Sequence, residues 1–258
     1  MPDRWSSKFH VLGVRVHAVQ IPDVVSLIER WIANRGRTRY IAVTGMHGVT
    51  EAKNNAGFRR ILNEADLVVP DGMPLVWLAR WQGHQLKRRV YGPELMATFC
   101  EQTCRKGYRH FLYGGAPGVA EDLAQRLAQH FPGLEVAGYY SPPFRPLSEL
   151  EQAELAAIIN QVSPDVVWIG LSTPKQERWM AEFQKKLRVP VLIGVGAAFD
   201  FHAGRTRQAP EWMRENGFEW LYRLLSEPRR LWRRYLIYGS QFVWNVLLEL
   251  VGVRVFNA

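Results

Sequence analysis

Short apolar segments alternate with longer segments of helical periodicity along most of the chain. The apolar segments are rich in Val, Ile, Leu and aromatic residues, as is typical of strands buried on both faces. The predicted strands cover residues 40–44, 66–69, 110–114, 166–170 and 191–195. The predicted helices cover residues 22–34, 49–63, 93–106, 116–130, 148–162 and 174–187. This alternation predicts a Rossmann-like α/β fold, with a mostly parallel sheet and helices on both faces.

Helix-initiating residues support this interpretation. Ser148 and Glu151 have the spacing of a capping box, and Pro117 and Pro174 lie where a first helical turn would begin. The chain has no internal repeat and no low-complexity linker. We therefore predict one α/β body over residues 1–204.

The remaining residues, 205–258, differ in composition and predict a basic helical appendage. Between Leu221 and Tyr238 there are five arginines and one acid, whereas no charged residue occurs from Tyr235 to Leu248. Three polar side chains spaced four residues apart share one face of this helix, and these are Gln241, Asn245 and Glu249. The opposite face is apolar and holds Trp232, Leu236, Ile237, Phe242, Val243, Val246, Leu247 and Leu250.

Two interpretations of this apolar face stay open. Basic residues beside a large apolar face are typical of a helix that lies in a membrane interface. Alternatively, the face packs on the protein itself or on another subunit. A membrane span is disfavoured because the uncharged run is shorter than the ~20 residues that a bilayer requires.

Composition and charge narrow the class of protein. The chain has 258 residues, a net charge of +9 and 47% hydrophobic residues, which excludes a disordered or fibrous protein. The two cysteines, Cys100 and Cys104, are too few for a disulfide framework. The N-terminus has no apolar run of secretory type, so we expect a cytoplasmic location. Asp-x-Asp, His-x-His and His-Glu-x-x-His motifs are absent, so we expect no metal and no other cofactor.

Ligands of open α/β sheets bind at the carboxyl ends of the strands, so the loops there are candidate sites. The sequence Gly-Gly-Ala-Pro-Gly begins at Gly114 and precedes a predicted helix, which suits either phosphate binding or an ordinary turn. Asp71 lies between Pro70 and Gly72 after a strand, where it serves either as a catalytic carboxylate or as a helix cap. Arginines near the C-terminus would neutralise an anionic leaving group without a metal.

Five sequence blocks occur in an order that resembles the WecG/TagA/CpsF family of bacterial glycosyltransferases. The blocks are PDGMPLVW, RRVYGPEL, GLSTPKQERW, GVGAAFDFHAG and RQAPEWMRENGFEWLYRLLSEPRRLWRR. The resemblance implies an inverting, metal-independent transfer of a sugar from a UDP-sugar to a polyprenyl-pyrophosphate-linked sugar. N-Acetylmannosamine-type and glucose-type donors both fit. It also implies a peripheral position on the inner face of the cytoplasmic membrane, a role in cell-surface or exopolysaccharide synthesis, and a homo-oligomer as one arrangement of the subunits.

The resemblance also implies roles for individual residues. Asp71 matches the general base, and Thr44 and Gln176 match polar positions that orient the substrates. Asp200 matches a nucleoside contact, while Gly114 and Gly115 let the backbone approach the nucleotide. Arginines match the positions that meet the pyrophosphate, namely Arg223, Arg230 and Arg233, with Arg89 as a further phosphate contact.

Two alternatives from other classes are weaker. A nucleotide-sugar epimerase or dehydrogenase would be expected to carry Gly-x-Gly-x-x-Gly and Tyr-x-x-x-Lys, and the chain has neither motif. A nucleic-acid-binding protein would account for the net charge of +9. However, the basic residues lie beside an apolar face, which suits a membrane better than a duplex, so we expect no nucleic-acid partner.

Overall fold

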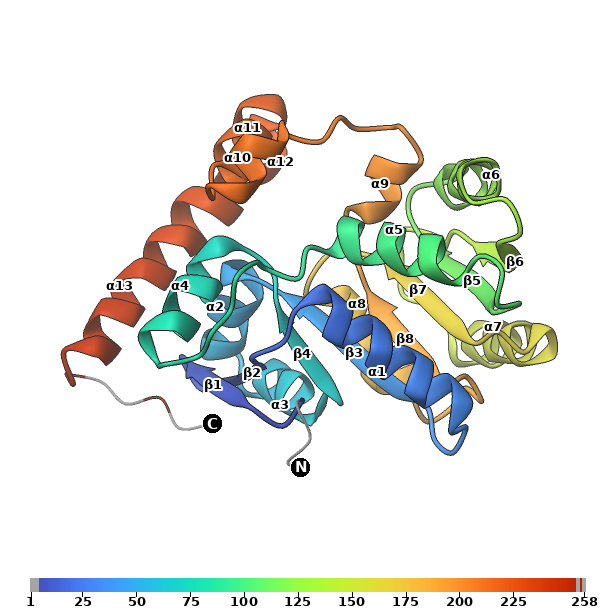
Figure 1. Cartoon of the computed structure of the whole chain (residues 1–258), viewed down its shortest axis with the longest axis horizontal. Coiled ribbons are helices and arrows are strands. Elements are labelled where there is room, and N and C mark those ends of the chain that lie inside the picture. The colour runs from blue at the N-terminus through green and yellow to red at the C-terminus, as the bar shows by residue number, and fades with distance from the viewer. Residues whose placement is uncertain (1–4, 254–255, 257–258) are drawn as a thin grey trace. The chain divides into compact units, whose positions relative to one another are not determined.

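A computed structural model describes residues 5–253 and residue 256 (Figure 1). The chain divides into two compact units. Unit 1 contains Met1–Gln20, Val43–Tyr91 and Gln208–Ala258, and unit 2 contains Ile21–Ala42 and Gly92–Arg207. All residues that line the candidate site belong to unit 1.

A six-stranded sheet confirms the predicted α/β class. Its strand order is β4-β3-β8-β7-β5-β6, and the β3–β8, β8–β7, β7–β5 and β5–β6 pairs are parallel. The strands are β3 (Arg39–Thr44), β4 (Leu67–Pro70), β5 (Arg109–Gly114), β6 (Glu135–Tyr140), β7 (Val166–Gly170) and β8 (Val191–Gly194). All the predicted strands are present, and β6 is additional.

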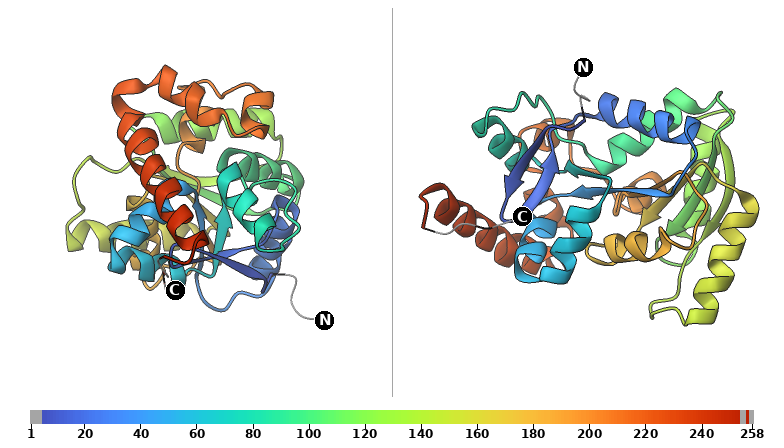
Figure 2. Two further views of the ribbon diagram at one scale, coloured as in Figure 1. Left: turned by 90° about the vertical axis from the view of Figure 1, so that its left-hand side faces the viewer. Right: turned by 90° about the horizontal axis from the view of Figure 1, so that it is seen from below.

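Helices cover both faces of the sheet within unit 2. Helices α1, α5 and α6 lie on one face, and α7 and α8 lie on the other (Figure 2). Their bounds are α1 (Ile21–Ala33), α5 (Gly92–Thr103), α6 (Val119–His130), α7 (Glu149–Val162), α8 (Lys175–Phe183) and α9 (Ala198–His202). The capping box that opens α7 is confirmed, since Ser148 Oγ accepts a hydrogen bond from the Glu151 amide and the Glu151 carboxylate accepts one from the Ser148 amide.

Unit 1 begins with an antiparallel hairpin that the sequence pattern does not predict. Strands β1 (Lys8–Val11) and β2 (Val14–His17) are joined by Leu12 and Gly13, which both have positive φ. Two-residue hairpin turns require this backbone geometry, but Leu is not a usual turn residue. The strands are also only four residues long, so they give little periodicity.

A single predicted helix at residues 49–63 is instead two helices, α2 (Met46–Asn54) and α3 (Ala56–Glu64). Asn55 is extended between them, and its side-chain oxygen accepts a hydrogen bond of 2.9 Å from the Phe58 amide. Asn competes well as a helix cap, so it ends one helix and begins the next. The chain then continues through β4 into α4 (Met73–Trp81).

The C-terminal part of unit 1 is helical, as predicted. It consists of α10 (Glu211–Glu215), α11 (Glu219–Ser226), α12 (Pro228–Trp232), the π-helical turn η1 (Arg233–Tyr238) and α13 (Gly239–Leu250). Helix α13 runs alongside α2 (Figure 1), where Phe242 and Val246 are buried. No helix in the described part of the chain is long and apolar enough to cross a bilayer.

The apolar face of α13 divides into a buried half and an exposed half. The polar stripe faces the protein, since Gln241 Oε1 accepts a hydrogen bond from Asn54 and the Glu249 carboxylate accepts one from the Leu12 amide. In contrast, Val243, Trp244 and Leu247 are at least half exposed. Packing on the protein therefore accounts for only part of this face.

Candidate active site

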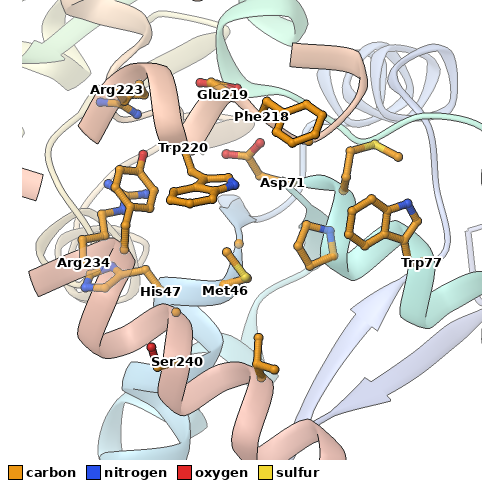
Figure 3. Close-up of a pocket in the computed structure, with 18 of the residues that line it drawn as sticks. Met46, His47, Asp71, Trp77, Phe218, Glu219, Trp220, Arg223, Arg234 and Ser240 are labelled. Carbon is orange, nitrogen blue, oxygen red and sulfur yellow. The ribbon is translucent and has the colours of Figure 1, made fainter. Parts of the chain in front are cut away.

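A pocket of about 700 Å³ lies within unit 1 (Figure 3). Three separate parts of the chain line it. They are the first turn of α2 at Gly45–His47, the β4–α4 connection at Asp71–Pro74 with Trp77 and Arg89, and the C-terminal segment from Asn216 to Leu247. Asp71 follows β4, whereas Glu219 and Arg223 belong to α11, and all three line this pocket (Figure 3).

Asp71 follows the last residue of β4 and is held by the backbone on both sides. Its amide donates a hydrogen bond of 2.7 Å to the Thr44 carbonyl, and the Val90 amide donates to the Pro70 carbonyl. Two glycines permit this geometry. Gly72 has a φ of +107°, and a Cβ at Gly45 would lie 2.5 Å from the Asp71 carbonyl oxygen. The close approach of the two strand-end loops therefore fixes where the carboxylate points.

The environment of Asp71 favours a carboxyl group that changes its charge near neutral pH. Burial raises the pKa to about 6, against the opposing charge of Arg89, and the Glu219 carboxylate raises it further. Arg234 and Arg223 lower the pKa by smaller amounts. Among the described residues, Asp71 Oδ1 has no hydrogen-bond partner. A carboxylate of this pKa, with an open acceptor atom, is suited to general-base catalysis.

Arg89 lies between two carboxylates. Its Nη2 donates a hydrogen bond to Glu219, and its Nη1 lies 3.8 Å from Asp71 Oδ1. The guanidinium also stacks 4.2 Å above the Tyr91 ring. The predicted phosphate contact is therefore engaged by protein groups in this structure.

Arg223 and Arg234 are the arginines of the C-terminal segment that line the pocket. Arg230 and Arg233, which the resemblance pairs with Arg223, are exposed and do not line it. Arg230 donates to Glu227, and Arg233 lies over the Trp232 ring. Two predicted phosphate contacts, Arg89 and Arg223, therefore line the pocket, together with Arg234, which was not assigned this role.

Of the other predicted site residues, one lies in unit 1 and four lie in unit 2. Thr44 ends β3 beside Asp71, is buried, and has no hydrogen-bond partner for Oγ1 within the described residues. Four others belong to unit 2, at the carboxyl ends of β5, β7 and β8, and they are Gly114, Gly115, Gln176 and Asp200.

Within unit 2 these residues form a tightly packed strand-end region. A Cβ at Gly114 would lie 2.7 Å from the Gly170 backbone, and the Gly115 amide donates to the Gly170 carbonyl. The buried Gln176 donates to Glu177 and lies close to Gly196. The Asp200 carbonyl accepts hydrogen bonds from the backbone that follows α9. The absence of a side chain at Gly114 therefore lets the ends of β5 and β7 approach each other closely.

The pocket also has apolar walls at its exposed side. Trp77 of α4, Phe218, and Trp244 of α13 line it, with exposed fractions of 52%, 47% and 63%. A carboxylate and arginines inside an apolar rim suit a ligand with both anionic and hydrocarbon parts.

Several lining residues carry no role in the sequence-based prediction. Arg234 lies in the arginine-rich run, so its charge could have marked it as a candidate phosphate contact. Nothing in the sequence around Glu219 marks it as a site residue, and only the fold brings it into the pocket. His47 packs edge-on against Tyr238, and burial together with Arg234 lowers its pKa to about 4. The described residues contain no group of three His, Cys, Asp or Glu side chains arranged to hold a metal ion.

Comparison with known proteins identifies the class of enzyme. Residues 9–255 match the model of the Glycosyl transferase WecG/TagA/CpsF family, and the chain therefore belongs to this family of glycosyltransferases. This membership decides between the enzyme class predicted from the sequence blocks and the nucleic-acid-binding and dehydrogenase classes.

Among the similar proteins, three examples carry the name N-acetylglucosaminyldiphosphoundecaprenol N-acetyl-beta-D-mannosaminyltransferase. The protein from Bacillus spizizenii is 30% identical over 217 residues, which cover 84% of this chain and 82% of the relative. That from Bacillus subtilis is 28% identical and covers 76% of this chain and 74% of the relative. That from Staphylococcus aureus strain MW2 is 26% identical and covers 88% of both chains.

Proposed function

We propose that this enzyme transfers an N-acetylmannosamine-type or glucose-type sugar from a UDP-sugar to a polyprenyl-diphosphate-linked sugar. The observation that carries the proposal is the Asp71 carboxylate, whose Oδ1 accepts no hydrogen bond from the described residues and which shares an apolar-rimmed pocket with Arg89, Arg223 and Arg234. The names of the relatives support a lipid-diphosphate acceptor and an aminosugar donor.

The reaction is a single displacement with inversion at the anomeric carbon. Asp71 accepts the proton of the acceptor hydroxyl as that oxygen forms its bond to the anomeric carbon. The bond from this carbon to the UDP oxygen breaks on the opposite face, and UDP leaves with the electron pair. The pKa of about 6 leaves Asp71 ionised at neutral pH and still basic enough to assist.

Arginines replace a metal ion in this proposal. Arg223 and Arg234 bring two positive charges into a partly apolar pocket, where they neutralise a diphosphate more effectively than in water. Within unit 1, Thr44 orients a substrate beside Asp71, Arg89 adds positive charge in the pocket, and Arg230 and Arg233 add positive charge outside it. For the residues of unit 2 we propose the roles that the resemblance implies, with Gln176 orienting a substrate and Asp200, Gly114 and Gly115 contacting the nucleotide.

The test of this function is acceptor-dependent release of UDP. We expect the purified enzyme to release UDP from one sugar of a UDP-sugar panel when a short-chain prenyl-diphosphate-sugar is supplied. EDTA should leave the rate within about twofold, because arginines rather than a metal stabilise the leaving group. Inhibition by EDTA that added Mn²⁺ or Mg²⁺ reverses would overturn the metal-independent mechanism. Absence of UDP binding by calorimetry would overturn the donor assignment.

The exposed apolar half of α13 suits contact with the membrane surface that carries the acceptor. We expect the enzyme to bind anionic phospholipid vesicles, and the substitutions V243S, W244S and L247S together to weaken binding by about tenfold or more, since they remove apolar contact area. Sedimentation with vesicles measures this. A matched control removes two exposed apolar side chains of α7 in unit 2, Leu150→Ser and Ile158→Ser, and should bind as the unaltered protein does. Equal binding by all three proteins would rule out α13 as the contact.

A further inference from the structure

The Arg89 guanidinium is shared unequally between two carboxylates of the pocket. It donates a hydrogen bond to Glu219 and remains 3.8 Å from Asp71, a distance too long for a hydrogen bond. Glu219 is itself only 8% exposed and is the first residue of α11. One arginine therefore connects the loop that bears the proposed base to the C-terminal segment.

This unequal sharing has a chemical consequence for Asp71. A carboxylate that accepts two hydrogen bonds from a guanidinium is a weaker base, because its lone pairs are engaged and its charge is neutralised. The Arg89 guanidinium lies over the Tyr91 ring, and this contact still allows it to turn in its own plane toward either carboxylate. Glu219 is the group that holds the guanidinium on the other side.

We propose that Glu219 is a positioning residue that holds Arg89 away from Asp71, so that the Asp71 carboxylate stays free to accept the proton of the acceptor hydroxyl. This inference rests on the proposed function of Asp71 as the base. Under this proposal the C-terminal segment supplies arginines to the pocket and also keeps Asp71 basic. Asp71 can accept a proton only when Glu219 of α11 binds Arg89.

The other charged groups around Asp71 do not replace Glu219. Arg223 and Arg234 act in the direction that lowers the pKa of Asp71, and His47, with a pKa of about 4, is neutral at neutral pH. Glu219 is the acidic group that opposes them. Loss of the Glu219 carboxylate would remove a charge that raises the pKa of Asp71 and would leave Arg89 without its hydrogen-bond acceptor, so that Arg89 could bind Asp71.

The experiment compares Glu219→Gln with a matched control. Glu215→Gln breaks the exposed ion pair with Arg88, which joins the same two segments one residue away from Arg89. We expect Glu219→Gln to lower kcat by about tenfold with little change in KM, because the base is weakened and not removed. The acidic limb of its kcat profile should move to lower pH, whereas Glu215→Gln should change neither kcat nor the limb.

A merely structural role for Glu219 would lower the rate without moving the acidic limb, and that result would overturn the proposal. Unchanged kcat would overturn it as well. Glu219→Asp keeps the charge and should recover most of the rate, so it provides the same test if the Gln variant does not fold. Failure of the underlying function is separately visible, because an Asp71→Asn variant would then remain active.

Discussion

Replacement of Asp71 by Asn is expected to reduce sugar transfer by about 10²-fold or more, since a positioned general base contributes ~10²–10⁴-fold. Asn has nearly the same shape, so binding of UDP should stay within about twofold, as for other isosteric changes that remove only the charge. Single-turnover transfer to a prenyl-diphosphate-sugar measures the first effect, and calorimetry measures the second. Near-normal turnover would remove Asp71 from the role of base.

The pH dependence provides an independent check on the same residue. Asp71 must be ionised to accept a proton, so kcat/KM should fall as the pH drops through about 6. Because burial raises the pKa in the folded protein, ionisation of Asp71 opposes folding above that pH. Asp71→Asn should therefore be more stable at pH 7.5 by roughly 1–3 kcal/mol. The difference should disappear below about pH 4, where the carboxyl is protonated in both states. Thermal unfolding at the two pH values measures this.

Loss of either pocket arginine is expected to have the next largest effect. Arg223→Gln and Arg234→Gln should each lower kcat/KM by about 10²-fold, which is typical for removal of one group that stabilises developing negative charge. Without a metal ion, the diphosphate would be neutralised mainly by these two side chains. Steady-state kinetics with the lipid-linked acceptor measure the loss.

Two comparisons make this expectation specific. Arg229→Gln removes an exposed arginine from the same segment and should leave kcat/KM within about twofold, as for a typical surface charge. Arg230→Gln and Arg233→Gln should cost less than the pocket substitutions, because these side chains do not line the pocket. If Arg233→Gln lowered kcat/KM as much as Arg234→Gln, the assignment of substrate contacts to the arginines that line the pocket would be wrong. The assignment implied by the family resemblance would then hold.

Periodicity predicts the central sheet because its strands are buried on both faces. The segments 110–114 and 166–170 contain no acidic or basic residue other than the buried His110 and are otherwise rich in apolar residues, and β5 and β7 lie at these positions. Strand β6 is different, since Glu135–Tyr140 lies at the edge of the sheet and is only partly buried. Its mixed pattern does not distinguish a strand from a loop, so it is missing from the prediction.

Position at a strand end identifies Asp71 as a site candidate, because the fold class makes those ends the usual place for ligands. The same reasoning does not find Glu219, whose neighbours in the chain are ordinary helix residues. Only tertiary packing brings it to Arg89, which is 130 residues away in the sequence. Arg234 is missed for a third reason, since the arginines are assigned from the resemblance, which matches Arg223, Arg230 and Arg233, whereas the side chain that lines the pocket depends on the path of the chain through α12 and η1.

The π-helical turn η1 determines how α13 responds to the loss of one residue from the C-terminal segment. Each residue of an α-helix turns the next side chain by about 100°, and a π turn accommodates an additional residue. Because the π turn absorbs the additional residue, deleting one residue between Arg233 and Tyr238 would restore regular helix and leave α13 close to its present orientation relative to α12. Phe242 and Val246 would then keep their buried positions on α2. A deletion of one residue within α13 has no such turn to absorb it and would rotate the residues that follow by about 100°.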